Sequence, residues 1–203
     1  MKIDIILAGV GGQGILSIAT IIGKAALDEN LYIKQAEVHG MSQRGGDVQS
    51  NLRVSDKPIS SDLIPYGKAD LILSMEPMEA LRYINYLSPK GWIITNSTPF
   101  INIDNYPDEQ AVKNTLDKMK NVIYFDMDAM AKDCGSPRSS NMVLLGAASP
   151  FLEMDANLFN NAIAAVFERK GEKIVDQNIA AFKAGRDYVL THLKDKNYAP
   201  AFK

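Results

Sequence analysis

The sequence predicts an α/β fold: a three-layer α/β/α sandwich, Rossmann-like, with a mostly parallel, partly mixed sheet and a helical C-terminal third. Three observations carry this prediction. Short apolar runs alternate with segments of helical periodicity over the first two-thirds of the 203 residues. One run, residues 47–54, alternates clearly between a mainly apolar face and a polar face. The last third has helical spacing throughout.

The first four elements follow directly from these patterns. Residues 3–9, IDIILAG, form an apolar run ending in glycine, which is typical of a buried parallel strand. Residues 15–27, ILSIATIIGKAAL, carry apolar side chains at helical spacing. Residues 32–38, YIKQAEV, and 47–54, DVQSNLRV, predict two more strands. The alternation in the latter leaves one face polar, which indicates a mixed sheet.

The middle of the chain continues the alternation. Residues 69–75, ADLILSM, predict a buried strand, and Pro77 suits the first turn of a helix. We expect that helix to carry Leu87 inward. The residues SPKG (88–91) should then turn the chain into the strand WIITN (92–96).

Cap residues set the next boundaries. Asp108 is a suitable N-cap for a helix, and residues 121–126, NVIYFD, predict the following strand. We expect Ser140 to cap a short apolar helix over residues 141–149, closed by Pro150.

The remainder is helical, with a break at one glycine. Phe159 and Ile163 belong to the buried stripe of one helix, and Phe182 and Val189 to that of a second. Gly171 between them is a C-terminal stop. Because the chain contains no internal repeat or low-complexity linker, we predict a single domain spanning residues 1–203.

Composition excludes several functions. With a net charge of −2 and interspersed charges, the chain has no basic stripe for nucleic acid. No apolar run approaches the roughly 20 residues of a membrane span, so we expect a cytoplasmic protein. Cys134 is the single cysteine, and His39 and His192 lie far apart, so no metal site or iron–sulfur cluster is expected. If the protein takes part in redox chemistry, the redox centre is carried by something other than cysteine-held metal in this chain.

A glycine-rich loop, GVGGQG, joins the first strand to the first helix. Gly9, Gly11 and Gly14 have the G-x-G-x-x-G spacing, in which backbone N–H groups approach a phosphate at a helix N-terminus. The alternative is that the glycines only allow close packing. Glu37 stands near the position of a ribose-binding acid, but a long polar loop follows it instead of a helix, which argues against a plain dehydrogenase.

The second loop combines a cation with flexible backbone. Arg44 lies between Gln43 and Gly45, a setting that suits phosphate or carboxylate recognition. A solvated surface turn is the alternative. His39 could titrate near neutral pH, or simply donate to a carbonyl.

Four stretches resemble one known family. They are GVGGQG (9–14), HGMSQRGGDVQSNLR (39–53), ADLILSMEPMEALR (69–82) and NIAAFKAGRDYV (178–189). Together they resemble the gamma-type domain of the 2-oxoacid:ferredoxin oxidoreductases, and most closely the short beta subunits of the indolepyruvate ferredoxin oxidoreductases.

The resemblance implies a subunit, inactive alone, of an enzyme that converts indolepyruvate or another arylpyruvate to acyl-CoA and passes electrons to ferredoxin. A larger partner subunit would carry thiamine diphosphate and the iron–sulfur clusters. This chain would hold no cofactor by itself but could contact coenzyme A. No catalytic residue is assigned. The implied cofactor-contacting residues are Gly9, Gly11, Gly12, Gln13, Gly14, Ser42, Gln43, Arg44 and Gly45.

Several alternatives stay open. The chain could be a free-standing NAD- or FAD-binding enzyme, or a purely structural partner whose loops only form an interface. Gln13 could bond the ligand or fix the loop. Asn141 could hold a loop or reach the interface.

Overall fold

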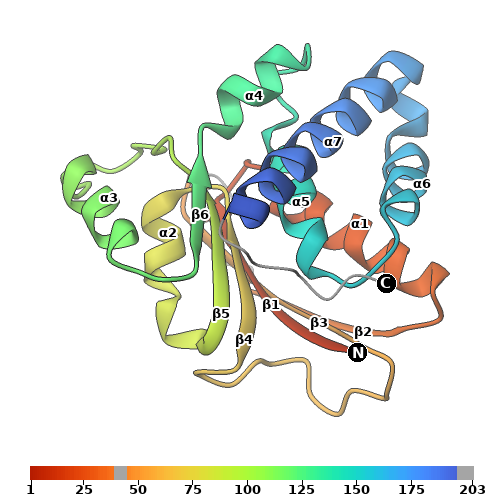
Figure 1. Ribbon diagram of the computed structural model, residues 1–203, viewed down its shortest axis with the longest axis horizontal. Helices are drawn as coiled ribbons and strands as arrows, with labels where there is room; N and C mark the ends of the chain where they lie inside the picture. Colours follow the sequence, from red (N-terminus) through yellow and green to blue (C-terminus); the bar gives the residue numbers. More distant parts are fainter. Residues whose placement is uncertain (39–44, 196–203) are drawn as a thin grey trace.

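The computed structural model describes residues 1–38 and 45–195 (Figure 1). The strands are β1 (Lys2–Val10), β2 (Tyr32–Val38), β3 (Asp47–Ser55), β4 (Ala69–Ser74), β5 (Leu87–Asn96) and β6 (Val122–Phe125). The helices are α1 (Ile15–Asp28), α2 (Pro77–Arg82), α3 (Glu109–Asp117), α4 (Met127–Asp133), α5 (Ser140–Ala148), α6 (Ala156–Phe167) and α7 (Glu172–Asp195).

One sheet organises the chain, with strand order β2-β3-β1-β4-β5-β6. Strands β1, β4, β5 and β6 are parallel, whereas β3 is antiparallel to both of its neighbours. Val10 pairs with Asp47, and Val38 pairs with Gln49. The carboxyl ends of β1 and β2 therefore meet the start of β3 at one edge of the sheet. The predicted mixed sheet is confirmed.

Alternate side chains of the central strands enter two separate cores. Leu7 and Leu73 pack beneath the layer that contains α1, α5, α6 and α7. Ile6, Ile72 and Ile93 pack on the other face, beneath α2 and α3. Figure 1 shows the two helical layers on opposite sides of the sheet. The predicted three-layer arrangement is therefore confirmed.

Helix α5 is buried on every side, between α7, which packs against its backbone, and α1, α4 and β5. A Cβ atom on Gly146 would lie 1.9 Å from the carbonyl oxygen of Phe182. A Cβ atom on Gly185 would lie 2.1 Å from that of Val143. Only glycine permits the two helices to approach this closely.

The expected boundaries around residue 87 were wrong. Helix α2 ends at Arg82, and Leu87 begins β5, so SPKG lies inside the strand instead of forming a turn. The pairing of β4 with β5 shifts register after Ala69, which accommodates the proline and glycine. Gly91 is required there, since a Cβ atom on it would approach the carbonyl oxygen of Ala69 to 2.7 Å.

Capping was predicted correctly at Asp108 but not at Ser140. Asp108 accepts from the backbone N–H of Ala111, as an N-cap does. Ser140 is instead the first helical residue, and its hydroxyl donates to Asp128. Gly171 separates α6 from α7 with φ +92°, which confirms its role as a stop.

Candidate functional site

The glycine loop and the β2–β3 loop leave the sheet at the same edge. The backbone N–H of Gly11 donates to the carbonyl of Gly46 at 2.9 Å, which ties the two loops together. Gly45 has φ +84°, and its carbonyl accepts from the side chain of Asn102. Four residues discussed above lie outside the described residues: His39, Ser42, Gln43 and Arg44.

The start of α1 presents open backbone donors at this edge. Gly14, with φ +80°, is the N-cap; glycine has no side chain that could accept from the helix N–H groups, and the first turn contains no acidic residue. Within residues 1–38 and 45–195, the N–H groups of Gly12, Gly14, Ile15 and Leu16 have no acceptor. The N-terminus of this 14-residue helix therefore favours an anion.

Gly12 is the most accessible part of the loop. It is exposed, has φ +102°, and a Cβ atom on it would meet nothing within 4 Å. Among the backbone amides of Gly11, Gly12 and Gly14, that of Gly11 is occupied by Gly46, whereas those of Gly12 and Gly14 have no acceptor among the described residues. The backbone N–H groups that remain available therefore lie at the α1 end of the glycine loop.

Two side-chain amides fix the shape of the loop. The Oε1 atom of Gln13 accepts from the N–H of Val10 at 2.7 Å, and its Nε2 donates to the carbonyl of Met75 at 3.3 Å. Asn141 donates through Nδ2 to the carbonyl of Gly14 at 3.2 Å. Both residues therefore hold the loop, Gln13 against β4 and Asn141 against α5. Gly9 leaves room for this packing, because a Cβ atom on it would lie 2.9 Å from Oε1 of Gln13.

Glu76 is a buried acidic residue beside the candidate site that the sequence analysis missed. It follows β4, is fully buried, and caps α2 by accepting from the N–H of Glu79 at 2.7 Å. The hydroxyl of Tyr106 donates to its other oxygen at 2.5 Å. Burial raises the pKa of Glu76, and burial together with this carboxyl raises the pKa of Tyr106. The indication in the sequence was an acidic residue directly before Pro77, the first residue of α2.

The loop of residues 97–106 crosses the same edge. It leaves β5 beside Asn96, is bonded to Glu76 through Tyr106, and reaches Gly45 through Asn102. It therefore runs from β5 past the end of β4 to the start of β3. The segment directly after β4 connects Glu76 to the glycine loop, because the carbonyl of Met75, the residue before Glu76, accepts from Gln13.

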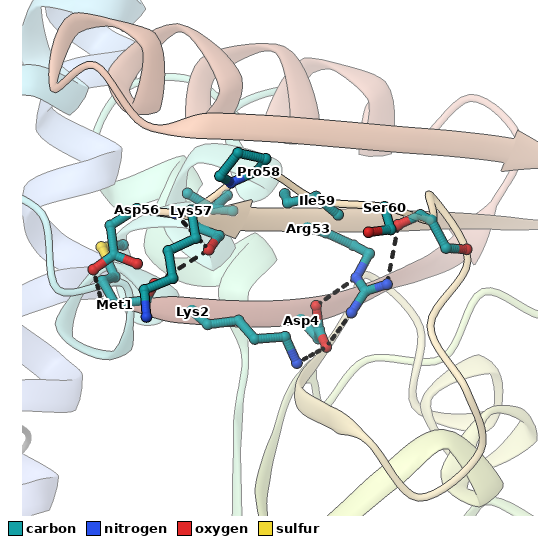
Figure 2. A pocket seen from close by; sticks show the side chains of 12 residues that line it. Met1, Lys2, Asp4, Arg53, Asp56, Lys57, Pro58, Ile59 and Ser60 are labelled. Carbon is teal, nitrogen blue, oxygen red and sulfur yellow. Dashed lines mark hydrogen bonds and ion pairs between the residues drawn. The ribbon is translucent and has the colours of Figure 1, made fainter.

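A hollow of about 620 Å³ lies at the opposite edge of the sheet, beside the amino end of β1 and the carboxyl end of β3 (Figure 2). Most of its charges are paired with one another. Asp4 binds Nε of Arg53 at 2.7 Å and Nζ of Lys2 at 2.7 Å, and the amino group of Met1 binds Asp56 at 2.6 Å. These contacts stabilise the fold, so this hollow is not the candidate site.

The described residues do not form a metal-binding site. They contain no group of three or more His, Cys, Asp or Glu side chains that could hold a metal ion. The pKa of the partly buried Cys134 thiol is raised by burial, the opposite of an activated thiolate. In the same part of the chain, every helix is too short or too polar to cross a bilayer.

The fold and site define a Rossmann-like α/β protein in which the N-terminus of α1 lies beside the residues that lead into the antiparallel strand β3. Residues 4–188 match the family model described as pyruvate ferredoxin/flavodoxin oxidoreductase. The chain belongs to this family. It is 38% identical to indolepyruvate oxidoreductase subunit IorB from Pyrococcus horikoshii, over 90% of this chain and 93% of the relative.

Solved structures share the fold, and two of them illustrate the likeness. One is 2-oxoglutarate:ferredoxin oxidoreductase from Magnetococcus marinus with 2-oxoglutarate, coenzyme A and succinyl-CoA bound, with a TM-score of 0.73 and 23% identity. The match covers 99% of this chain and 32% of that longer chain. The other is the gamma subunit of keto/oxoacid ferredoxin oxidoreductase from Geobacter sulfurreducens, with a TM-score of 0.69 and 23% identity, covering 93% of this chain and 99% of that one.

Proposed function

We propose that the chain is the gamma-type subunit of an enzyme that decarboxylates an arylpyruvate, such as indolepyruvate, oxidatively. The acyl group passes to coenzyme A, carbon dioxide leaves, and the electron pair passes to ferredoxin. The family match and the 38% identity to an indolepyruvate oxidoreductase subunit support this assignment. The chain acts as a single domain in the cytoplasm, and a larger partner subunit carries thiamine diphosphate and the iron–sulfur clusters.

The glycine loop binds a phosphate group of coenzyme A. The observation that carries this is the set of open amide donors at the start of α1, led by Gly12 and Gly14. An exposed Gly12 with positive φ leaves space for a phosphate to approach the backbone. The related fold with coenzyme A bound in the Magnetococcus enzyme is consistent with this role.

Ser42, Gln43 and Arg44 are proposed to contact the same ligand. The support for this contact is the bond between Gly11 and Gly46, which brings the neck of the β2–β3 loop to the glycine loop. A guanidinium there would pair with a phosphate or carboxylate of the ligand.

Strand order argues against the alternative of an NAD- or FAD-binding enzyme. In a dinucleotide-binding unit, the acid that holds the ribose ends the strand next to β1. Here β3 occupies that place and runs antiparallel, so its carboxyl end lies at the opposite edge. Glu37, on β2, is one strand further out.

Substitution of the exposed glycine tests the site. The chain and its thiamine diphosphate partner subunit are co-purified, and arylpyruvate-dependent ferredoxin reduction is measured against coenzyme A concentration. Gly12→Asp places a carboxylate at the open donors, so we expect KM for coenzyme A to rise at least tenfold with assembly retained. Gly67→Asp is the matched control, because Gly67 also has positive φ and open surroundings but lies at the other edge.

Three outcomes would overturn the assignment. An unchanged KM for coenzyme A in Gly12→Asp would show that coenzyme A does not bind at the glycine loop. Turnover of arylpyruvate by the chain alone would show that it does not need a partner subunit. Micromolar, saturable NAD or FAD binding to the purified chain, measured by calorimetry, would establish the dinucleotide alternative.

A further inference from the structure

We infer that Glu76 and Tyr106 form a positioning pair that holds the loops of the coenzyme A site in their binding geometry. This inference rests on the proposed function and gives a role to two residues that do not themselves contact the ligand. It is carried by three properties of Glu76: its burial without a cation, the division of its hydrogen bonds, and the contacts that continue from it to both loops of the site.

Glu76 is buried without a cation. Its exposed fraction is 0%, and none of the ion pairs within residues 1–38 and 45–195 includes it. Glu79, the next buried carboxylate, differs in this respect, because Arg82 donates to both of its oxygens, at 2.7 and 3.0 Å. An ionised carboxylate buried without a cation costs stability. Capping of α2 does not require that cost, because Ser, Thr or Asn serves as well at an N-cap.

The carboxyl of Glu76 divides its hydrogen bonds between α2 and the loop of residues 97–106. One oxygen accepts from the backbone N–H of Glu79 and so caps the helix. The other accepts from the hydroxyl of Tyr106, and the carboxyl also faces the backbone N–H of Phe100. A carboxylate can do this because both of its oxygens accept, whereas a glutamine has one acceptor oxygen. Glu76 therefore holds the loop near its middle and at its end.

The loop is packed closely around this bond. A hollow of only about 10 Å³ remains between the loop and helices α2 and α3, and it is lined by Pro77, Ser97, Pro99, Tyr106, Glu109, Val112 and Lys113. The two charged residues in this lining, Glu109 and Lys113, have opposite signs. The hollow therefore supplies Glu76 with no net positive charge, and the neutral hydroxyl of Tyr106 is the group that reaches it.

On one side, the contacts continue from Glu76 to the glycine loop. The carbonyl of Met75, directly before Glu76, accepts from Nε2 of Gln13 at 3.3 Å. Oε1 of the same Gln13 accepts from the backbone N–H of Val10 at 2.7 Å. The segment that carries Glu76 therefore also fixes the turn that presents the open amides.

On the other side, the contacts continue through the 97–106 loop to the β2–β3 loop. Asn102 donates to the carbonyl of Gly45, and the next carbonyl, that of Gly46, accepts from the backbone N–H of Gly11 at 2.9 Å. These bonds close a ring of contacts that runs from Glu76 through both loops and returns to it through Tyr106. A ring closed before the ligand arrives reduces the conformational entropy lost on binding. Opening it should therefore weaken coenzyme A binding.

The test measures ferredoxin reduction by the co-purified enzyme against coenzyme A and against arylpyruvate. In Tyr106→Phe and in Glu76→Gln, the loop loses one charge-assisted bond, so we expect KM for coenzyme A to rise at least about fivefold. We expect kcat and KM for arylpyruvate to stay within about twofold, because ordering of these loops concerns coenzyme A alone. A merely structural role would lower the folded fraction without this difference between the two substrates.

The matched control is Tyr124→Phe. The hydroxyl of Tyr124 also donates to a carboxylate, that of Asp117 at 2.6 Å, but this bond joins β6 to the end of α3 and is not part of the ring. KM for coenzyme A should be unchanged in this variant. If Tyr106→Phe fails to fold, Glu76→Gln still decides, because removing the buried charge should stabilise it at neutral pH.

A double-mutant cycle with Asn102→Ala tests the route. Either substitution opens the same ring, so the rise in KM for Tyr106→Phe/Asn102→Ala should be smaller than the product of the two single rises. Independent effects, which multiply, would overturn the ring of contacts.

The outcomes separate this inference from the proposed function. If KM for coenzyme A is unchanged in Tyr106→Phe and Glu76→Gln but rises in Gly12→Asp, the positioning pair is overturned and the coenzyme A site stands. Equal rises in KM for coenzyme A and for arylpyruvate would show a general loss of order, which also overturns the pair. An unchanged KM in Gly12→Asp overturns the proposed coenzyme A site itself.

Discussion

At the scale of single residues, the glycine loop is shaped by partners that are distant in sequence. Gln13 reaches Met75, and Asn141 reaches Gly14, across 62 and 127 positions. The spacing of glycines predicted the loop and its place before a helix. It could not predict which amides are already bonded, because that depends on long-range contacts such as the one between Gly11 and Gly46.

Replacing Gly14 with alanine should destabilise the protein more than the same change at Gly12. Both have positive φ, which costs an alanine about 1–2 kcal/mol. At Gly14 the new Cβ would also lie 2.5 Å from Nδ2 of Asn141, whereas at Gly12 it meets nothing. We expect Gly14→Ala to lower the free energy of unfolding by at least about 1 kcal/mol more in urea titrations.

A double-mutant cycle checks the cause. In an Asn141→Ala background, the extra loss at position 14 should disappear, because the clashing amide is gone. If Gly14→Ala and Gly12→Ala cost the same in the native background, contact with Asn141 does not constrain this turn.

At the scale of elements, Glu76 connects β4, α2 and the 97–106 loop. Its carboxyl caps a helix of only six residues and receives the hydroxyl of Tyr106. The sequence predicted the strand before Glu76 and the helix after it. It did not predict the burial, because the loop that covers Glu76 returns to it from 30 residues later.

The stability contribution of Glu76 should fall as pH rises. Burial raises its folded-state pKa above the ordinary value of 4.5, so the folded protein keeps the proton to a higher pH than the unfolded chain. Free energy of unfolding is therefore lost from about pH 4.5 upward until the folded pKa is passed, by up to about 1.4 kcal/mol per pH unit. In Glu76→Gln this loss should be absent, so the variant gains stability relative to the native protein across that window.

Urea titrations between pH 4 and 8 measure this difference. Subtracting one curve from the other cancels the contribution of Asp70, whose pKa is also raised by burial. Tyr106→Phe should extend the window to higher pH, because the lost hydroxyl donor had lowered the pKa of Glu76. Parallel curves for the native protein and Glu76→Gln would mean that Glu76 titrates equally in both states.

At the scale of the whole molecule, the two edges of the sheet have different tasks. The carboxyl edge collects the open amides, the 45–46 turn and the 97–106 loop. The amino edge holds paired charges around Asp4 and Arg53 (Figure 2). Strand β1 separates the edges by nine residues, about 30 Å of extended chain.

The sequence specified the layers well because apolar periodicity reports which faces are buried. It indicated a mixed sheet from the alternation in residues 47–54, and that run is β3. It did not place β3 between β2 and β1, since period-two patterns carry no information about neighbours. Helix α4 escaped notice because a seven-residue helix has too few turns for a clear stripe. In the candidate site, residues 42–44 remain predictions.

Arg53→Met should therefore damage stability and leave binding intact. The side chain of Asp4 is 1% exposed and that of Arg53 12%, so removing Arg53 leaves a buried carboxylate without its main partner. The guanidinium also donates to the carbonyls of Ser61 and Leu63, so the loop after β3 loses its anchor as well. Breaking a buried pair of this kind costs about 3–5 kcal/mol.

Lys2→Met is the matched control, because Lys2 contacts the same carboxylate but is 59% exposed, and such pairs contribute less than about 1 kcal/mol. Thermal unfolding should show a much larger fall in Tm for Arg53→Met than for Lys2→Met. At a temperature where both variants are folded, their assembled enzymes should keep the native KM for coenzyme A. A raised KM in Arg53→Met would show that the edges are coupled through β1, since the substitution touches nothing at the carboxyl edge.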